Sequence, residues 1–161
     1  YNTAMTPNKL TFIPALALVG ALGGCGPVPL PKGDEALKIA REAKLPIYIS
    51  DLRTNIPLMG GNIDVSIDYV NTSGKTIRSV RFYLVAKDSQ GNSVPDMRTN
   101  QFTVKLDHLE QIEPNAKGSG HWKAVWENRR IVCSLIKQTD VEYADGTLIN
   151  GYIGIRRSDC R

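Results

Sequence analysis

The sequence has little of what several classes of protein require. Its 161 residues include three cysteines and two histidines, too few for a disulfide-dense miniprotein or a zinc-finger array. Twenty Lys and Arg residues face sixteen Asp and Glu residues, and this small excess is not gathered into runs, which argues against nucleic-acid binding. The longest stretch with almost no polar side chain, Leu10–Leu22, has thirteen residues, whereas a membrane-spanning helix needs about twenty. A polytopic membrane protein is therefore excluded, and one globular domain is expected.

Residues 1–24 differ from the rest of the chain and are interpreted as a signal peptide with upstream residues. Met5 opens the segment, Lys9 is its only charged residue, and the apolar stretch follows. A short basic start, a short apolar core and then small residues are typical of secretory signal peptides. Pro14, inside the apolar core, argues against a stable buried helix.

The end of this segment, Leu22-Gly23-Gly24-Cys25, resembles the lipobox of bacterial lipoproteins. The resemblance implies that Cys25 is lipidated and becomes the first residue of the mature chain, anchored to a membrane by acyl chains. Gly26 in the next position implies the outer membrane with the domain on its periplasmic face, and an inner-membrane or cell-surface location stays open. The alternatives are an ordinary secretory signal with an incidental cysteine, or an N-terminal anchor.

Between the signal and the main domain the sequence predicts a tether and a helix. Residues 25–33 contain Pro27, Pro29 and Pro31, which favour an extended, stiff segment. Residues 34–45 are rich in Ala, Leu, Glu, Lys and Arg, which predicts one short helix with Asp34 as its N-cap that ends before Pro46.

From residue 46 to residue 161 the pattern is that of β-strands. Apolar and polar residues alternate with period two, most clearly at Ile63–Tyr69 and Val80–Lys87, and turn residues separate the runs. The other expected strands are Ile47–Ser50, Phe102–Asp107, Trp122–Trp126, Ile131–Tyr143 and Thr147–Ile155. One turn is placed where Glu113-Pro114-Asn115 and Gly118-Ser119-Gly120 surround it, and another at Asp145-Gly146, a dipeptide that favours a type I′ hairpin.

This order of elements predicts an all-β fold. About seven strands without alternating helices favour an antiparallel β-sandwich of immunoglobulin-like size, with a barrel as the alternative. Residues 51–149 also resemble bacterial Ig-like domains of the FxLYD type and related secreted domains of unknown function. The order of Ile63–Ser73, Val80–Leu84 and Val141–Gly146 carries that resemblance. It implies a fold and a periplasmic or cell-surface setting, and it brings no catalytic residues.

Two cysteines remain once Cys25 is assigned to the anchor. In an oxidising periplasm Cys133 and Cys160 are expected to form a disulfide that ties the C-terminal tail to a core strand. The alternative is that Cys133 is a small buried core residue, as its alternation with Ile131 and Leu135 allows.

The sequence offers no recognisable catalytic, metal or cofactor site. His108 and His121 are isolated and lack the spacing of zinc ligands. Asp64, Ser66 and Asp68 are expected to line the solvated face of a strand. No nucleophile motif or phosphate-binding loop is present. We therefore expect no enzyme activity and no cofactor.

The candidate binding residues are Trp122, Trp126, Arg156 and Arg157. The tryptophans could stack on a sugar or anchor a partner, or one of them could fill the core. The C-terminal arginines, like Arg129-Arg130, could meet anionic lipid or glycan, or they could keep a strand edge soluble. Two hypotheses follow: a membrane-anchored, non-catalytic binding or scaffolding module for another envelope component, or a carbohydrate- or small-ligand-binding module that uses an exposed tryptophan.

Overall fold

The computed structural model describes residues 33–152 and 158–160. Three of the predicted features lie outside these residues: the signal peptide, the tether that begins at Cys25, and the basic pair Arg156 and Arg157. No helix in the described part of the chain is long and apolar enough to cross a membrane.

The described chain contains one helix and eight strands, one strand more than the approximate sequence count. In chain order they are α1 Asp34–Glu42, β1 Ile47–Asn55, β2 Asn62–Asn71, β3 Ile77–Lys87, β4 Ser93–Val94, β5 Thr103–His108, β6 Lys117–Glu127, β7 Cys133–Tyr143 and β8 Leu148–Tyr152. The additional strand, β4, has only two residues and carries no periodicity that sequence reasoning could detect.

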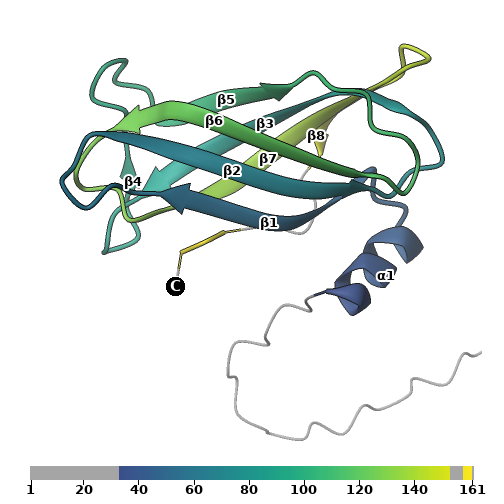
Figure 1. Cartoon of the computed structure of the whole chain (residues 1–161), viewed down its shortest axis with the longest axis horizontal. Coiled ribbons are helices and arrows are strands. Elements are labelled where there is room, and N and C mark those ends of the chain that lie inside the picture. The colour runs from purple at the N-terminus through teal and green to yellow at the C-terminus, as the bar shows by residue number, and fades with distance from the viewer. Residues whose placement is uncertain (1–32, 153–157, 161) are drawn as a thin grey trace, which may run out of the picture.

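The strands form two antiparallel sheets that pack face to face (Figure 1). One sheet has the order β1-β2-β6, and the other has the order β4-β3-β7-β8 with β5 also paired to β3. Because β2 and β3 belong to different sheets, and β5 and β6 do as well, the chain crosses between the layers as it does in immunoglobulin-like sandwiches. The predicted all-β sandwich fold is confirmed, and the barrel alternative is wrong.

The core lies between the two sheets and follows from the alternation along the strands. Inward-facing residues of β2 and β3, such as Ile67, Tyr69 and Phe82, are fully buried. Their neighbours in the sequence, such as Asp68 and Arg81, face outward and form ion pairs on the sheet surfaces. This is the one-sided pattern of an antiparallel sheet with one packed face and one wet face.

The helix covers one end of the outer face of the β1-β2-β6 sheet. Ala36 and Ala40 pack against the paired residues Tyr48 and Val70. The N-cap is Gly33 rather than the predicted Asp34, which is the first helical residue, and no side chain caps that end.

The helix ends at Glu42, earlier than the predicted residue 45. The amide of Leu45 donates to the Ala40 carbonyl and the amide of Lys44 to the Arg41 carbonyl, which is the hydrogen-bond pattern of a Schellman motif. Lys44 takes the left-handed position of that motif, with φ of 53°. This turn ends the helix before Pro46 and directs the chain into β1.

The residues Gly118–Gly120, which were assigned to the surroundings of a turn, lie inside β6. A Cβ atom on Gly118 would stand 2.4 Å from the Tyr69 ring, and one on Gly120 would stand 2.2 Å from the Trp122 ring. Both glycines therefore allow large aromatic side chains to lie close to the strand backbone, a use of glycine that looks like a turn signal in the sequence.

The hairpin between β7 and β8 forms where it was predicted, but not as a type I′ turn. Gly146 has φ of 82°, whereas Asp145 is not among the residues with positive φ. The Gly146 amide donates to the Tyr143 carbonyl and the Tyr143 amide to the Thr147 carbonyl. This is a three-residue loop closed by a glycine bulge.

The loops gather at two opposite ends of the sandwich (Figure 1). The tether end carries α1, the β2–β3 turn, the β5–β6 loop and the β7–β8 hairpin. The distal end carries the β1–β2, β3–β4, β4–β5 and β6–β7 connections. Any chain entering from the N-terminal side reaches the domain through α1, and therefore at the tether end.

Candidate functional site

The two predicted tryptophans occupy different environments, and neither offers a free ring. Trp126 is fully buried in the core, so its prediction as a binding-surface residue is wrong and the alternative of a core tryptophan holds for it. Its Nε1–H has no hydrogen-bond partner among the described residues. Trp122 is half-buried, donates from Nε1 to the Asp107 carbonyl at 3.1 Å and contacts Phe82 edge-on.

The tryptophans lie four residues apart on β6, and both point inward on either side of a bulge. Ile63 pairs with Trp126 and Val65 pairs with Trp122, so one residue of β2 opposes three residues of β6. Ala124, in the middle of the three, has φ of 53°, and its amide donates to the Asp64 carboxylate at 2.8 Å. The bulge brings Val125 into the core beside Trp126.

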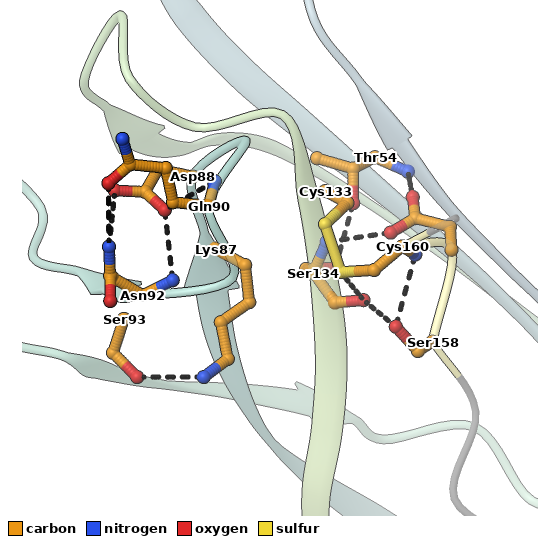
Figure 2. Close-up of a disulfide and its surroundings, with 11 residues drawn as sticks. Thr54, Lys87, Asp88, Gln90, Asn92, Ser93, Cys133, Ser134, Ser158 and Cys160 are labelled. Carbon is orange, nitrogen blue, oxygen red and sulfur yellow. Dashed lines mark hydrogen bonds between the residues drawn. A yellow bond between two sulfur atoms is a disulfide. The ribbon is translucent and has the colours of Figure 1, made fainter.

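Cys133 and Cys160 are joined in a disulfide with a Cα–Cα distance of 5.0 Å. Figure 2 shows this bond beside Thr54 and Ser134. The disulfide ties the C-terminal segment to the start of β7, where Ser158 also forms a bridge with Leu135. Cys133 is buried in the structure as well, so the bonded cysteine occupies the interior position that the alternation of β7 gives it.

Asp159, which sequence reasoning did not single out, joins the two sheets beside this disulfide. Its carboxylate accepts hydrogen bonds from the Thr54 amide of β1 and the Ser134 amide of β7, both at 2.6 Å. The Thr54 and Ser134 hydroxyls also lie 2.7 Å apart. One carboxylate thus links β1 of one sheet to β7 of the other.

The disulfide sulfurs and the Asp159 carboxylate are close enough together to serve as metal ligands. Cysteine binds metal as a thiolate, and both sulfurs here are committed to the disulfide. The arrangement as it stands is therefore a covalent staple rather than a metal site.

The outer face of the β1-β2-β6 sheet brings together a serine, a histidine and an aspartate. Ser66 Oγ lies 2.9 Å from His121 Nδ1, and His121 Nε2 lies 3.7 Å from Asp64 Oδ2. The second distance is longer than a hydrogen bond, and Asp64 already accepts from the Ala124 amide. Ser66 also sits on a central strand whose two edges are both paired, so its neighbouring amides are not available to stabilise an oxyanion. These residues form a solvated strand face, as predicted from Asp64, Ser66 and Asp68.

The outer face of the other sheet carries a polar groove of about 430 Å³. Arg81 on β3 forms two hydrogen bonds with the Asp107 carboxylate of β5, at 2.6 and 3.3 Å, which raise the pKa of Arg81 further. The Tyr83 hydroxyl donates to Asp140 at 2.7 Å, and this bond raises the pKa of Tyr83. The charged groups of this face therefore satisfy one another.

The distal end presents the two most exposed apolar side chains of the described chain, Leu58 and Met59, with three more beside them. We define the distal loop surface as Leu58 and Met59 of the β1–β2 loop, Met97 and Phe102 of the β4–β5 loop, and Val132 of the β6–β7 loop. Leu58 and Met59 are fully exposed, and Met97 is 70% exposed. Sequence reasoning placed Phe102 on an inward strand face, but β5 begins one residue later and Phe102 is exposed.

These three loops lie next to one another. The Met97 amide donates to the Glu127 carbonyl at 3.1 Å, and Glu127 pairs with Asn62 at the end of the β1–β2 loop. A Cβ atom on Gly60 would stand 3.2 Å from the Arg129 side chain of the β6–β7 loop. The exposed apolar residues thus belong to one region of the surface.

A buried carboxylate organises the β4–β5 loop. Asp96 is almost fully buried, and it accepts hydrogen bonds from the Glu127 amide, the Thr99 hydroxyl and the Arg98 guanidinium. Burial, the largest single influence, raises the pKa of Asp96, but these hydrogen bonds together hold that pKa below its ordinary value. Met97 is therefore presented by a loop that is already ordered.

A second buried carboxylate ties the β3–β4 turn to the β6–β7 loop. Asp88 accepts from the amides of Asn92 and Gln90 and from the Arg130 guanidinium at 2.9 Å. These hydrogen bonds, that of the Asn92 amide first, lower the pKa of Asp88. Between this turn and the disulfide lies a groove of about 550 Å³, whose two sides are visible in Figure 2.

Comparison with known proteins shows little beyond this geometry. The sequence matches no protein-family model and no curated protein. Among solved structures, it is similar to a hypothetical protein from Peptoclostridium difficile 630, with 11% sequence identity and a TM-score of 0.43 over 66% of this chain and 86% of that one. A likeness of this size carries no argument about function.

Proposed function

We propose that this chain is a lipid-anchored protein of the bacterial cell envelope whose β-sandwich binds another envelope protein without catalysing a reaction. The distal loop surface is the observation that carries the proposal. Leu58, Met59 and Met97 expose large apolar side chains to water on adjoining loops, and such a grouping on a folded domain marks an interaction surface. Methionine also adapts its shape to a partner.

The structural ordering of two connections at the distal end supports the same proposal. Binding a partner costs free energy when loops must first be fixed in place. Here Asp88 and Asp96 already hold the β3–β4 and β4–β5 connections by several hydrogen bonds each. The part of the surface on the β4–β5 loop, with Met97 and Phe102, is thus prepared for contact, and the whole surface lies at the end of the domain opposite α1.

The lipobox-like sequence supports the proposed location. A chain anchored at Cys25 on the periplasmic face of the outer membrane would hold the domain by its tether end and present the distal loop surface to the periplasm. Carbohydrate binding through a tryptophan has less support, because Trp126 is buried and the Nε1–H of Trp122 is already engaged.

The anchor is tested by labelling cells with a radioactive fatty acid and separating their membranes. We expect label on the wild-type chain in the membrane fraction and none on the Cys25→Ser variant. An unlabelled chain that begins at Met5 in the soluble fraction would refute the anchor.

The binding surface is tested by chemical crosslinking in intact cells followed by mass spectrometry. We expect the yield of a crosslinked protein adduct to be at least about tenfold lower for the double variant Leu58→Ser, Met59→Ser than for the wild type. Removing central apolar contacts has effects of this size at other interfaces. Leu109→Ser is the matched control, because Leu109 is an exposed leucine on the β5–β6 loop at the tether end. Equal adduct in all three proteins would contradict the proposal.

A further inference from the structure

A third groove, of about 430 Å³, lies at the tether end between the end of α1 and the β2–β3 turn. We call it the tether-end groove. Its charged lining residues are Arg41, Lys44 and Lys75, and no acidic side chain lines it. The rest of its wall is made by hydroxyl-bearing residues and by Leu45, Tyr143 and Ile149.

The cations of this groove come from two separate elements and are only partly neutralised. Lys75 pairs with Asp145 at 2.7 Å. Arg41 donates to the side-chain amide oxygen of Asn115 and, like Lys44, has no carboxylate partner among the described residues. Cations near the end of a helix are favoured by its dipole, which accounts for Arg41 and Lys44 individually. It does not account for Lys75, which the β2–β3 turn brings to the same groove.

Both walls of the groove are fixed by buried or ordered groups. Asn71, which is fully buried, donates to the Lys75 carbonyl at 2.8 Å and accepts from the Ser73 amide at 3.0 Å, so the turn has one shape. On the other wall, Lys44 is held in the left-handed conformation, which disfavours every residue except glycine by crowding at Cβ. A glycine would end the helix with less strain, and the lysine adds a charge at the groove.

The remaining lining gives the groove an apolar part. Tyr143 and Ile149 belong to or pack against the main core, and Leu45 packs against the cluster beneath α1. A ligand that matches both parts carries an anionic group for the cations and a hydrocarbon chain for the apolar wall. Inorganic phosphate would satisfy only the first part.

We infer that the tether-end groove binds the phosphate head group of an anionic phospholipid, with the start of an acyl chain against Leu45 and Ile149. The choice of a lipid as the source of the phosphate rests on the proposed anchor, since an anchored chain keeps this end at the bilayer. Binding there would add an electrostatic contact to the lipid anchor and would orient the domain with the distal loop surface away from the membrane.

The test uses the chain as isolated from membranes in a nonionic detergent, with native mass spectrometry to count bound lipids. Phosphatidylglycerol, phosphatidylcholine and inorganic phosphate are added in separate titrations. We expect a single phosphatidylglycerol adduct, at least about tenfold weaker binding of phosphatidylcholine, and no competition by millimolar phosphate. Equal binding of the two lipids, or displacement of phosphatidylglycerol by inorganic phosphate, would overturn the inference.

Variants assign the binding to the groove. Arg41→Gln with Lys44→Gln is expected to weaken the phosphatidylglycerol adduct by at least about tenfold. Lys38→Gln, which removes a cation from the same helix outside the groove, is expected to leave it unchanged. Lys44→Gly removes the charge while relieving the backbone strain, so weaker binding by a well-folded variant separates loss of the site from loss of the fold. Unchanged binding in the double variant would contradict the inference.

The same spectra separate this inference from the proposed function. The mass of the isolated chain reports whether Cys25 carries its lipid, independently of any phospholipid adduct. A lipidated chain that binds no phosphatidylglycerol would refute the groove and leave the anchor standing. An unmodified chain that does bind it would refute the anchor and leave the groove as a phospholipid site.

Discussion

The two ends of the sandwich are built from different chemistry. The tether end has a helix, two cations without a carboxylate partner in the described part of the chain, and a groove with an apolar wall. The distal end has exposed leucine and methionine side chains, and the buried carboxylates Asp88 and Asp96 hold its β3–β4 and β4–β5 connections. One β-sandwich can thus carry a groove with cationic walls at one end and its two most exposed apolar side chains at the other, because its loops are independent of its core.

The difference also concerns how each end is stabilised. At the distal end the disulfide and Asp159 join β1 to β7, so the loops there rest on a covalent and hydrogen-bonded closure. At the tether end the Schellman turn and the Asn71 turn act locally. Substitutions at the distal end should therefore change the stability of the domain more than substitutions at the tether end.

The largest effect on stability is expected from removing the disulfide between Cys133 and Cys160. Cys133→Ser with Cys160→Ser opens a loop with a sequence separation of 27, and the chain-entropy relation gives a loss of about 3.5 kcal/mol in the free energy of unfolding. Urea unfolding measures the loss. Hydrogen exchange should speed up at the Thr54 and Ser134 amides more than at Ser73. A loss below about 1 kcal/mol would show that the tail does not close the distal end.

A smaller loss is expected from the buried carboxylate of the β4–β5 loop. Asp96→Ala leaves the Glu127 amide and the Arg98 guanidinium without their acceptor, at a cost of about 2–3 kcal/mol, and it should also weaken partner binding by releasing Met97. Asp51→Ala is the control, because the ion pair of Asp51 with Arg53 is exposed and its loss should cost less than about 1 kcal/mol. Equal stability of the two variants would contradict the role assigned to Asp96.

The third effect in order of size is expected from acid, which should lower the stability of the distal end. The pKa values of Asp88 and Asp96 lie below that of an ordinary carboxyl group in the folded protein. Their contribution to stability is therefore complete above the pKa of these carboxyl groups in the unfolded chain, about 4. It is lost as the pH falls through their lower pKa values in the folded protein. The melting temperature should fall below about pH 4, and less steeply in Asp96→Asn than in the wild type. A parallel fall in both would exclude Asp96 as a cause.

The smallest effect belongs to the tether end and has the opposite sign. Lys44→Gly should stabilise the domain by about 1 kcal/mol, because glycine adopts the left-handed position without a clash at Cβ. Lys44→Ala keeps the clash and should give no gain. Thermal unfolding compares the two, and a gain in both variants would mean that the lysine charge, rather than the backbone, is responsible.

The sequence predicted the strands of the core better than the surfaces. Alternation at Ile63–Tyr69 and Val80–Lys87 reports burial directly, and both segments are strands in the structure. Gly118 and Gly120 were misassigned because a glycine that accommodates a ring and a glycine that makes a turn look alike in the sequence. Trp126 was misassigned as a surface residue because alternation places Trp122 and Trp126 on one face of a strand but does not say whether that face is packed against the other sheet.

The candidate surfaces were harder to predict from the sequence, for a different reason. The distal loop surface and the tether-end groove each combine residues from loops far apart in the sequence, and only the fold brings them together. The signal available beforehand was small: the apolar Ile56-Pro57-Leu58-Met59 segment before Gly60-Gly61, where a polar turn is the usual choice.

The central claim, that the two ends meet different partners, is tested most directly by site-specific photocrosslinking in intact cells. A photoreactive amino acid is placed at position 58 in one strain and at position 147, beside the tether-end groove, in another. The account predicts a discrete protein adduct from position 58 and a phospholipid adduct from position 147. Lipid adducts from position 58, or the same protein adduct from both positions, would contradict it.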